Sequence, residues 1–247
     1  MRTEKASRPN AADDKARRFA VAGFVASLKH RLRDTLAETA LPERLEAVAR
    51  QVERRVAAGA SSADERLAER FTQAATSIGA RVHPATIADW LDVVAGLLPA
   101  LRIGCVAIPR AGDGFFEAEQ VEQLKQRLAA DGITARSETD DETLFSAEAA
   151  ITGVVAAVAE TGTLVCESQP TVARGSSLIP PVHIAVVTHS QLLPDLCDCF
   201  DALSERSELP ANVSLISGPS KTADIEGVLV TGVHGPGDVQ VVLVREG

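Results

Sequence analysis

The sequence predicts an α/β fold, in which a helical N-terminal region precedes one domain with a mostly parallel or mixed sheet. Two observations lead to this prediction. Up to about residue 100, apolar side chains recur at spacings of three and four, which is typical of amphipathic helices. From Arg102 onward, short apolar runs alternate with helical patterns, which is typical of strands joined by helices. The composition, 45% hydrophobic and 24% charged, is that of a globular chain that can bury a core.

The N-terminal region is expected to contain four helices, of which the third ends at Gly79 and the fourth follows Pro84. The chain is thereby divided into three parts, which are a disordered tail at 1–10, a helical region at 11–100 that packs on the domain, and the α/β domain at 101–247.

Seven strands are predicted in the α/β domain, together with two helices that the apolar pattern marks out. One helix ends at Gly132 and the other covers residues 190–203. The acidic run at 140–142 is interpreted as a helix N-terminus rather than a metal site. The first two strands are spaced as in a parallel crossover, and the short, Gly-rich connections of the last strands favour an antiparallel or mixed edge. The predicted strands are 103–108, 133–136, 163–166, 183–187, 213–216, 227–230 and 239–244.

The charge and the aromatic content argue against a protein that binds nucleic acid or an anionic membrane. The 25 basic and 34 acidic residues give a formal net charge of −9, which repels phosphate groups. Only 3% of the residues are aromatic, so rings on which bases could stack are scarce. No apolar stretch is long enough to span a membrane, and residues 1–10 lack the apolar core of a signal peptide. A cytoplasmic location is therefore expected.

The four cysteines predict neither a disulfide scaffold nor a metal centre. Cys105, Cys166, Cys197 and Cys199 are few and scattered. The last two are too close for a Cys-x-x-Cys motif, and the sequence lacks the Cys-x-x-Cys-x-x-Cys run that ligates a four-iron cluster. We expect no metal and no cofactor in this chain, so any iron–sulfur chemistry must be carried by a partner protein.

Three polar segments interrupt the apolar runs of the C-terminal half, each where a strand is expected to end, and the first, at residues 159–163, carries Glu160. A carboxylate between two apolar runs is costly unless it is paired, hydrogen-bonded or at the edge of the sheet. Gly162 permits a positive φ or the close approach of a ligand. The hydroxyls of Thr161 and Thr163 can orient the carboxylate or a substrate anion. A β-turn whose glutamate faces water is an alternative of equal weight.

The second segment, at residues 217–226, combines a Gly-Pro-Ser turn with a lysine. Unpaired backbone N–H groups and the charge of Lys221 suit an anion. The glycine spacing of a phosphate-binding loop is missing. Taken alone, the segment is better explained as a capped turn with Ser220 as the N-cap. Its candidate ligand-binding residues are Ser217, Gly218, Ser220, Lys221, Thr222 and Asp224.

The third segment, at residues 232–238, contains a Gly-Pro-Gly loop, His234 and the candidate ligand-binding residue Gly235. A histidine here can donate to an anion or move a proton near neutral pH, although a solvated side chain is the commoner explanation. Loops that follow successive strands of an α/β sheet converge on one crevice. Glu160, Lys221 and His234 are therefore predicted to share a pocket for a small anionic molecule, with Glu160 and His234 as candidate catalytic residues.

Together, the three segments resemble the signature of the LUD-domain family, and within it the lactate utilization protein C group. The motifs are Ala-Glu-Thr-Gly-Thr-Leu (159–164), Ile-Ser-Gly-Pro-Ser-Lys-Thr-Ala-Asp-Ile-Glu (216–226) and Gly-Val-His-Gly-Pro (232–236), in this order. Residues 177–180 and 183–187 also fit the middle strand of that family.

This resemblance implies a three-layer α/β/α fold similar to that of sugar-phosphate isomerases and CoA transferases. It also implies a role in the oxidation of L-lactate to pyruvate, in a system of three components. The two other components are iron–sulfur proteins, so this chain would be the cluster-free one, and it would bind a small carboxylate or another anion.

Two other functions stay open. One is a stand-alone CoA-transferase-like or sugar-phosphate-isomerase-like enzyme, with Glu160 as nucleophile or general base and Lys221 holding an anion. The other is a non-catalytic regulator whose pocket binds lactate or a related acid.

Overall fold

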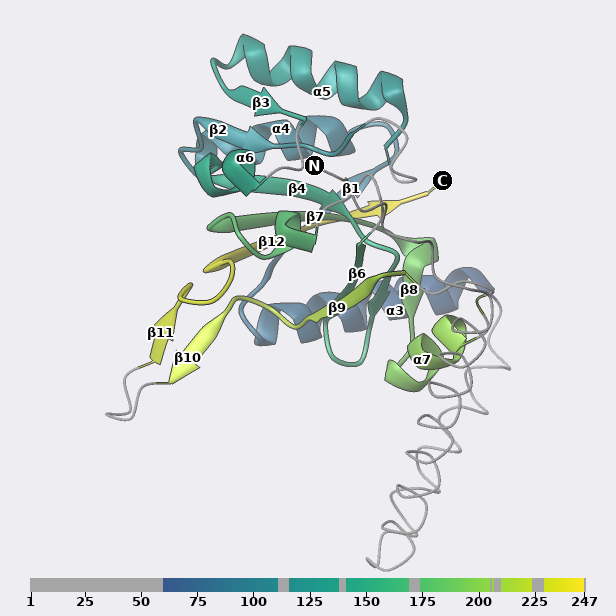
Figure 1. The fold of residues 1–247 in the computed structure, drawn as a ribbon. Helices are drawn as coiled ribbons and strands as arrows, with labels where there is room; N and C mark the ends of the chain where they lie inside the picture. The colour runs from purple at the N-terminus through teal and green to yellow at the C-terminus, as the bar shows by residue number, and fades with distance from the viewer. Residues whose placement is uncertain are drawn as a thin grey trace, which may run out of the picture. The chain divides into compact units, whose positions relative to one another are not determined.

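A computed structural model describes most of the chain from Ala60 onward (Figure 1). The expected N-terminal tail, the helices predicted before residue 60 and the candidate residue Asp224 lie outside the described residues. No helix within the described ranges is both long and apolar enough to cross a membrane. The described residues are 60–110, 116–137, 141–168, 174–204, 206, 210–223 and 229–246.

A six-stranded parallel sheet forms the centre of the domain (Figure 1). Its order is β1-β12-β7-β4-β2-β3, and every neighbouring pair is parallel. The inner strands β12, β7 and β4 are apolar along most of their length, as strands covered on both faces are. The strands are β1 (Arg81–Thr86), β2 (Cys105–Ala107), β3 (Thr134–Arg136), β4 (Ala149–Gly153), β7 (Val182–Thr188) and β12 (Asp238–Arg245).

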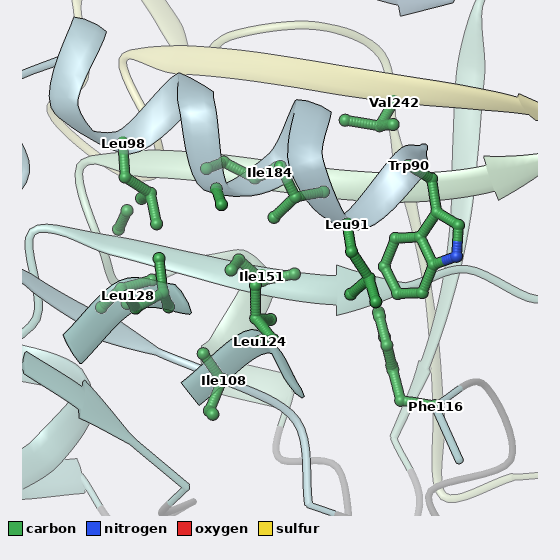
Figure 2. Close-up of a cluster of buried hydrophobic side chains, with 14 of the residues drawn as sticks. Trp90, Leu91, Leu98, Ile108, Phe116, Leu124, Leu128, Ile151, Ile184 and Val242 are labelled. Atoms are coloured by element: carbon green, nitrogen blue, oxygen red, sulfur yellow. The ribbon is translucent and has the colours of Figure 1, made fainter. Parts of the chain in front are cut away.

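Helices α4 (Trp90–Ala100) and α5 (Ala118–Ala130) cover one face of this sheet. The rings of Trp90 and Phe116 pack at this face with centroids 5.5 Å apart. Each fully buried leucine here contributes about 1.5–3 kcal/mol to stability. The cluster shown in Figure 2 includes Trp90, Leu98, Leu124, Leu128, Ile151, Ile184 and Val242.

The other face is covered by helices α3 (Ala60–Ser77) and α6 (Asp141–Ser146) and by a second, four-stranded sheet. This small sheet has the order β8-β5-β6-β9, and helix α7 (Leu196–Ser204) packs on its far side. Helices thus lie on both faces of the parallel sheet, so the expected α/β fold class is confirmed. The remaining strands are β5 (Ala156–Val158), β6 (Thr163–Ser168), β8 (Leu192–Leu193), β9 (Asn212–Ile216) and the hairpin β10 (Lys221–Ala223) and β11 (Leu229–Thr231).

Strand β1 corrects the expectation that the chain is helical up to residue 100. It pairs with β12 at the edge of the sheet, where Pro84 is tolerated because one side of an edge strand has no partner. Ala85 is its only buried residue, so the hydrophobic signal of a strand is weak. Helix α4 then begins at Trp90. Elements on both sides of the expected boundary at residue 100 consequently share one sheet.

Of two further expectations about the C-terminal half, one was confirmed in part and the other was wrong. Among the last predicted strands, β9 lies at an edge and pairs antiparallel with β6, and β11 pairs antiparallel with β10, but β12 lies inside the large sheet and pairs in parallel with both β1 and β7. The helix expected at 190–203 begins only at Leu196, after a 3₁₀ turn (His189–Gln191) and strand β8. Pro194 accounts for the late start, since proline cannot donate within a helix and disfavours helical geometry in the residue before it.

Gly96 offers a stabilising substitution. It lies exposed inside helix α4, and a Cβ built there would meet no other atom within 4 Å. Glycine in a helix interior costs about 0.5–1 kcal/mol relative to alanine. The Gly96→Ala variant should therefore unfold with a free energy higher by about 0.5–1 kcal/mol in urea denaturation. An unchanged or lower value would contradict the exposed helical placement.

Candidate functional site

Antiparallel strand ends bring the three polar segments into contact. The first segment joins β5 to β6, the second joins β9 to β10, and the third joins β11 to β12. Strands β5 and β9 both run antiparallel to β6, so the end of β5, the start of β6 and the end of β9 meet at one edge. In the antiparallel hairpin β10–β11, the start of β10 pairs with the end of β11, so the second segment lies beside the third.

Three hydroxyl groups form a row where the first and second segments meet. The Oγ1 atoms of Thr161 and Thr163 lie 2.7 Å apart, and Thr163 Oγ1 lies 2.8 Å from Ser217 Oγ. Thr163 is buried, whereas Thr161 is half-buried and Ser217 is exposed. The buried Thr163 hydroxyl therefore lies in the middle of the row, and the exposed hydroxyl of Ser217 at one end can donate to or accept from a polar ligand.

The second and third segments are joined through the backbone of Ser220. Its N–H donates to the carbonyl of Pro236 over 2.8 Å, and its carbonyl accepts from the N–H of Gly232 over 2.9 Å. A Cβ added to Gly235 would lie 3.4 Å from the Cβ of Ser220, in van der Waals contact. The predicted Ser220 N-cap is not formed, because β10 begins at Lys221 where a helical turn was expected. Thr222 lies within this strand.

The carboxylate of Glu160 is paired with Arg70 of helix α3. Arg70 Nη2 donates to Glu160 Oε1 over 3.1 Å, and the two side chains are 31% and 51% exposed. The second guanidinium nitrogen, Nη1, is buried and has no hydrogen-bond partner in the described part of the chain. Arg70 was not among the predicted site residues. It occupies the polar side of α3, and nothing in a single sequence links positions 90 residues apart.

The C-terminal half of α3 also holds the glycines and the lysine of the predicted site. Gly162 has φ of +66°, and its Cα faces the backbone at Ala74 and Ala75 so closely that a Cβ would lie 2.3 Å from Ala75 N. Gly218 lies against the carbonyl of Ile78. Lys221 Nζ donates to that same carbonyl over 2.7 Å, at a helix end where carbonyl groups lack intrahelical donors. The close approach that Gly162 permits is thus to a helix.

The three charged side chains of the predicted pocket have separate surroundings. Glu160 and Lys221 bind α3 at Arg70 and Ile78, which are eight residues or about 12 Å apart along the helix axis. His234 is exposed and lines a cavity of about 480 Å³ together with residues of its own loop and of 178–181. Neither Glu160 nor Lys221 lines that cavity. The structure brings the backbones of the segments together, and a ligand shared by these three side chains stays a prediction.

Burial suppresses ionisation of two groups near these segments. Burial raises the pKa of the Cys166 thiol to about 12, against a smaller lowering by a hydrogen bond with Ser177. Burial lowers the pKa of His183 to about 4. Both groups are therefore neutral at physiological pH, and Cys166 is a poor nucleophile. Within the described ranges, no three His, Cys, Asp or Glu side chains are grouped as metal ligands would be.

Comparisons with known proteins place the segments in one family. Residues 68–244, which include all three segments, match the LUD domain. Lactate utilization protein C of an Exiguobacterium species is 39% identical over 117 residues, which are 46% of this chain and 51% of that protein. The protein of the same name from Bacillus velezensis is 31% identical over 170 residues, 62% of this chain and 70% of that protein. The chain matches about half the length of the first of these curated relatives.

A solved structure shares the fold. The crystal structure of a DUF162 family protein from Deinococcus radiodurans superimposes with a TM-score of 0.52 at 23% identity, over 73% of this chain and 98% of that one. At this identity the likeness supports the fold alone. The sequence match over 68–244 covers most of the 247 residues and contains the three ordered motifs. The chain therefore belongs to the LUD domain family.

Proposed function

We propose that this protein acts in lactate utilization, as a cluster-free component that works with iron–sulfur partner proteins in the oxidation of L-lactate to pyruvate. The observation that carries the proposal is the family match over residues 68–244, together with relatives named lactate utilization protein C. The cysteine pattern of the full sequence agrees with this role, because it contains no run of ligands for a four-iron cluster.

The proposed ligand is a small carboxylate, held where the three polar segments meet. The hydroxyl row of Thr161, Thr163 and Ser217 supplies donors for carboxylate oxygens. Arg70, which pairs with Glu160 of the first segment, and Lys221 of the second segment supply positive charge, and His234 of the third segment borders a cavity of its own. In this proposal Glu160 accepts a proton from a hydroxy acid, and Arg70 orients the carboxylate group of Glu160.

Growth on L-lactate tests the proposed role. Deletion of the gene in its own organism should abolish growth on L-lactate and leave growth on pyruvate intact, and the wild-type gene should restore it. Unchanged growth on L-lactate in a strain without a paralogue would overturn the proposal.

Two substitutions in the restored strain test whether Glu160 takes part. The Glu160→Gln variant should restore growth on L-lactate poorly while it folds like the wild type. Asp92→Asn is the matched control. Asp92 of α4 is also an exposed carboxylate paired with an arginine, Arg127 of α5, but this pair lies away from the three segments. This control should restore full growth. Equal growth of both variants would remove Glu160 from the proposed mechanism and leave the protein a binding or organising subunit.

A further inference from the structure

A second cavity lies at the opposite ends of the parallel strands from the polar segments. It has a volume of about 730 Å³ and is bounded by one side of α3, by the last residues of β1 and β12, and by His189, which directly follows β7. Ligands of open α/β sheets bind outside the carboxyl ends of the strands. A volume of this size is in the usual range for small-molecule sites. None of the residues of the three segments lines it.

Two walls of this cavity carry carboxylates. Glu65 and Glu69 lie one turn apart on α3, and both are exposed. Asp89 lies on the opposing wall, just before α4, where its Oδ1 accepts from the backbone N–H of Thr86 over 2.6 Å and from the Thr86 hydroxyl over 2.9 Å. These bonds fix the orientation of the carboxylate, and the backbone bond above all lowers the pKa of Asp89. Asp89 is therefore ionised at neutral pH.

The cavity has a net negative charge and an apolar floor. Three carboxylates, of Glu65, Glu69 and Asp89, and one guanidinium, that of Arg245, line the cavity, so these four side chains carry a formal net charge of −2. The floor consists of Ala68, Ala85 and Leu243, and each of these residues is at most 8% exposed. Methylene groups of a ligand can pack on such side chains.

The carboxylates are spread apart, and this arrangement favours an organic ammonium ion over a metal ion as the ligand. The described residues contain no group of three His, Cys, Asp or Glu side chains close enough to hold a metal ion. Carboxylates on two walls with an apolar strip between them match ammonium groups joined by an aliphatic chain.

We propose that this cavity binds a small aliphatic ammonium compound. Its ammonium groups contact Glu65, Glu69 and Asp89, its methylene groups cover the apolar floor, and a carboxylate, where the ligand has one, pairs with Arg245. The two sources of this chemistry are a free diamine and a basic amino acid. Arg245 gains a partner only with the second.

Calorimetric titration of the full chain tests the proposal with four compounds: cadaverine, L-lysine, glutarate and L-lactate. Cadaverine and glutarate are matched, because both have five carbons and they carry charges of opposite sign. Cadaverine, L-lysine or both should bind, and binding should weaken as salt is added. Glutarate should not bind at this site. Binding of both amines indicates the diamine class, whereas binding of L-lysine alone indicates a basic amino acid held by Arg245.

Two variants locate the binding. Glu69→Gln should weaken amine binding about tenfold, because one charge-assisted contact is lost. Glu122→Gln is the control, since Glu122 is an exposed glutamate of α5 on the other side of the sheet, and it should leave the affinity unchanged. Failure of both amines to bind at millimolar concentration, or equal affinities for the wild type and Glu69→Gln, would overturn the proposal. If L-lactate also binds, and Glu69→Gln leaves that binding unchanged, the heat comes from the small-acid site of the proposed function. The two proposals are thereby tested separately.

Discussion

Replacing Gly162 by alanine is expected to lower the free energy of unfolding by about 2–5 kcal/mol. Two costs combine in this variant. A residue with a Cβ is strained by about 1–2 kcal/mol at the φ of +66° that Gly162 adopts. The new Cβ would also lie 2.3 Å from Ala75 N and 2.5 Å from Ala75 Cα, so the turn must move away from the backbone of α3. Backbone cannot give way as a flexible side chain can, and such overpacking costs about 1–3 kcal/mol.

Gly132→Ala is the matched control for this experiment. Gly132 follows helix α5 with φ of +73°, and a Cβ built there meets nothing within 4 Å. Its variant should lose about 1–2 kcal/mol, from backbone strain alone. Urea denaturation of both variants and the wild type, followed by circular dichroism, measures the difference. Equal losses for the two variants would show that Gly162 does not pack against α3 as described.

The Gly162 contact also explains why α3 belongs to the site. This helix pairs Arg70 with Glu160, and Ile78 near its end accepts from Lys221. Movement of the turn at Gly162 would therefore shift the groups of the first two segments relative to each other. The glycine of the Ala-Glu-Thr-Gly-Thr motif has a packing role whether or not a ligand contacts it.

The elements that the sequence predicts best are those with a regular pattern of burial, either on both faces of a strand or along one stripe of a helix. Strands β7 and β12 lie inside the sheet with helices on both faces, so their sequences are nearly uninterrupted apolar runs. Helix α5 shows its buried stripe at Val121, Leu124 and Leu128, and Gly132 follows its end. In these cases local pattern and tertiary environment agree.

Only half of the small sheet was predicted. Strands β6 and β9 correspond to the predicted strands 163–166 and 213–216, whereas β5 and β8 are too short to carry a pattern. Strand β5 has three residues and β8 has two, and their pairing depends on partners distant in the chain. Alternation needs several residues before it can be distinguished from a helix or a loop. The edge strand β1 was missed for a related reason, since only one of its six residues is buried.

The site was predicted in part. Each polar segment does follow a strand, as the sequence indicated, but those strands belong to the small sheet and the hairpin. Their ends meet through antiparallel pairing, whereas the prediction relied on the convergence of loops at the carboxyl ends of parallel strands. The cavity at those carboxyl ends is lined by α3 and β1, which local patterns did not connect with the C-terminal half.

Lowering the pH from about 7 to about 4 is expected to remove about 3 kcal/mol of unfolding free energy through His183 alone. Its imidazole is fully buried in β7, where Nε2 lies 2.8 Å from Thr152 Oγ1 and Nδ1 has no hydrogen-bond partner in the described part of the chain. Burial lowers its pKa from the ordinary 6.5 to about 4 in the folded protein. Between these values the unfolded chain binds a proton that the folded chain does not, so stability falls as the pH falls through this window.

Urea denaturation at several pH values between 7 and 4, on three proteins, measures this contribution of His183. In His183→Asn no imidazole is buried at this position, so the unfolding free energy should fall less steeply with pH than in the wild type, whatever its value at neutral pH. His234→Asn removes an exposed imidazole and retains His183, so it should keep the steeper fall. An NMR titration of the wild-type His183 ring gives a second readout that does not need a folded variant. An imidazole signal that titrates near 6.5, or equal slopes for His183→Asn and wild type, would show that His183 is not held neutral by burial.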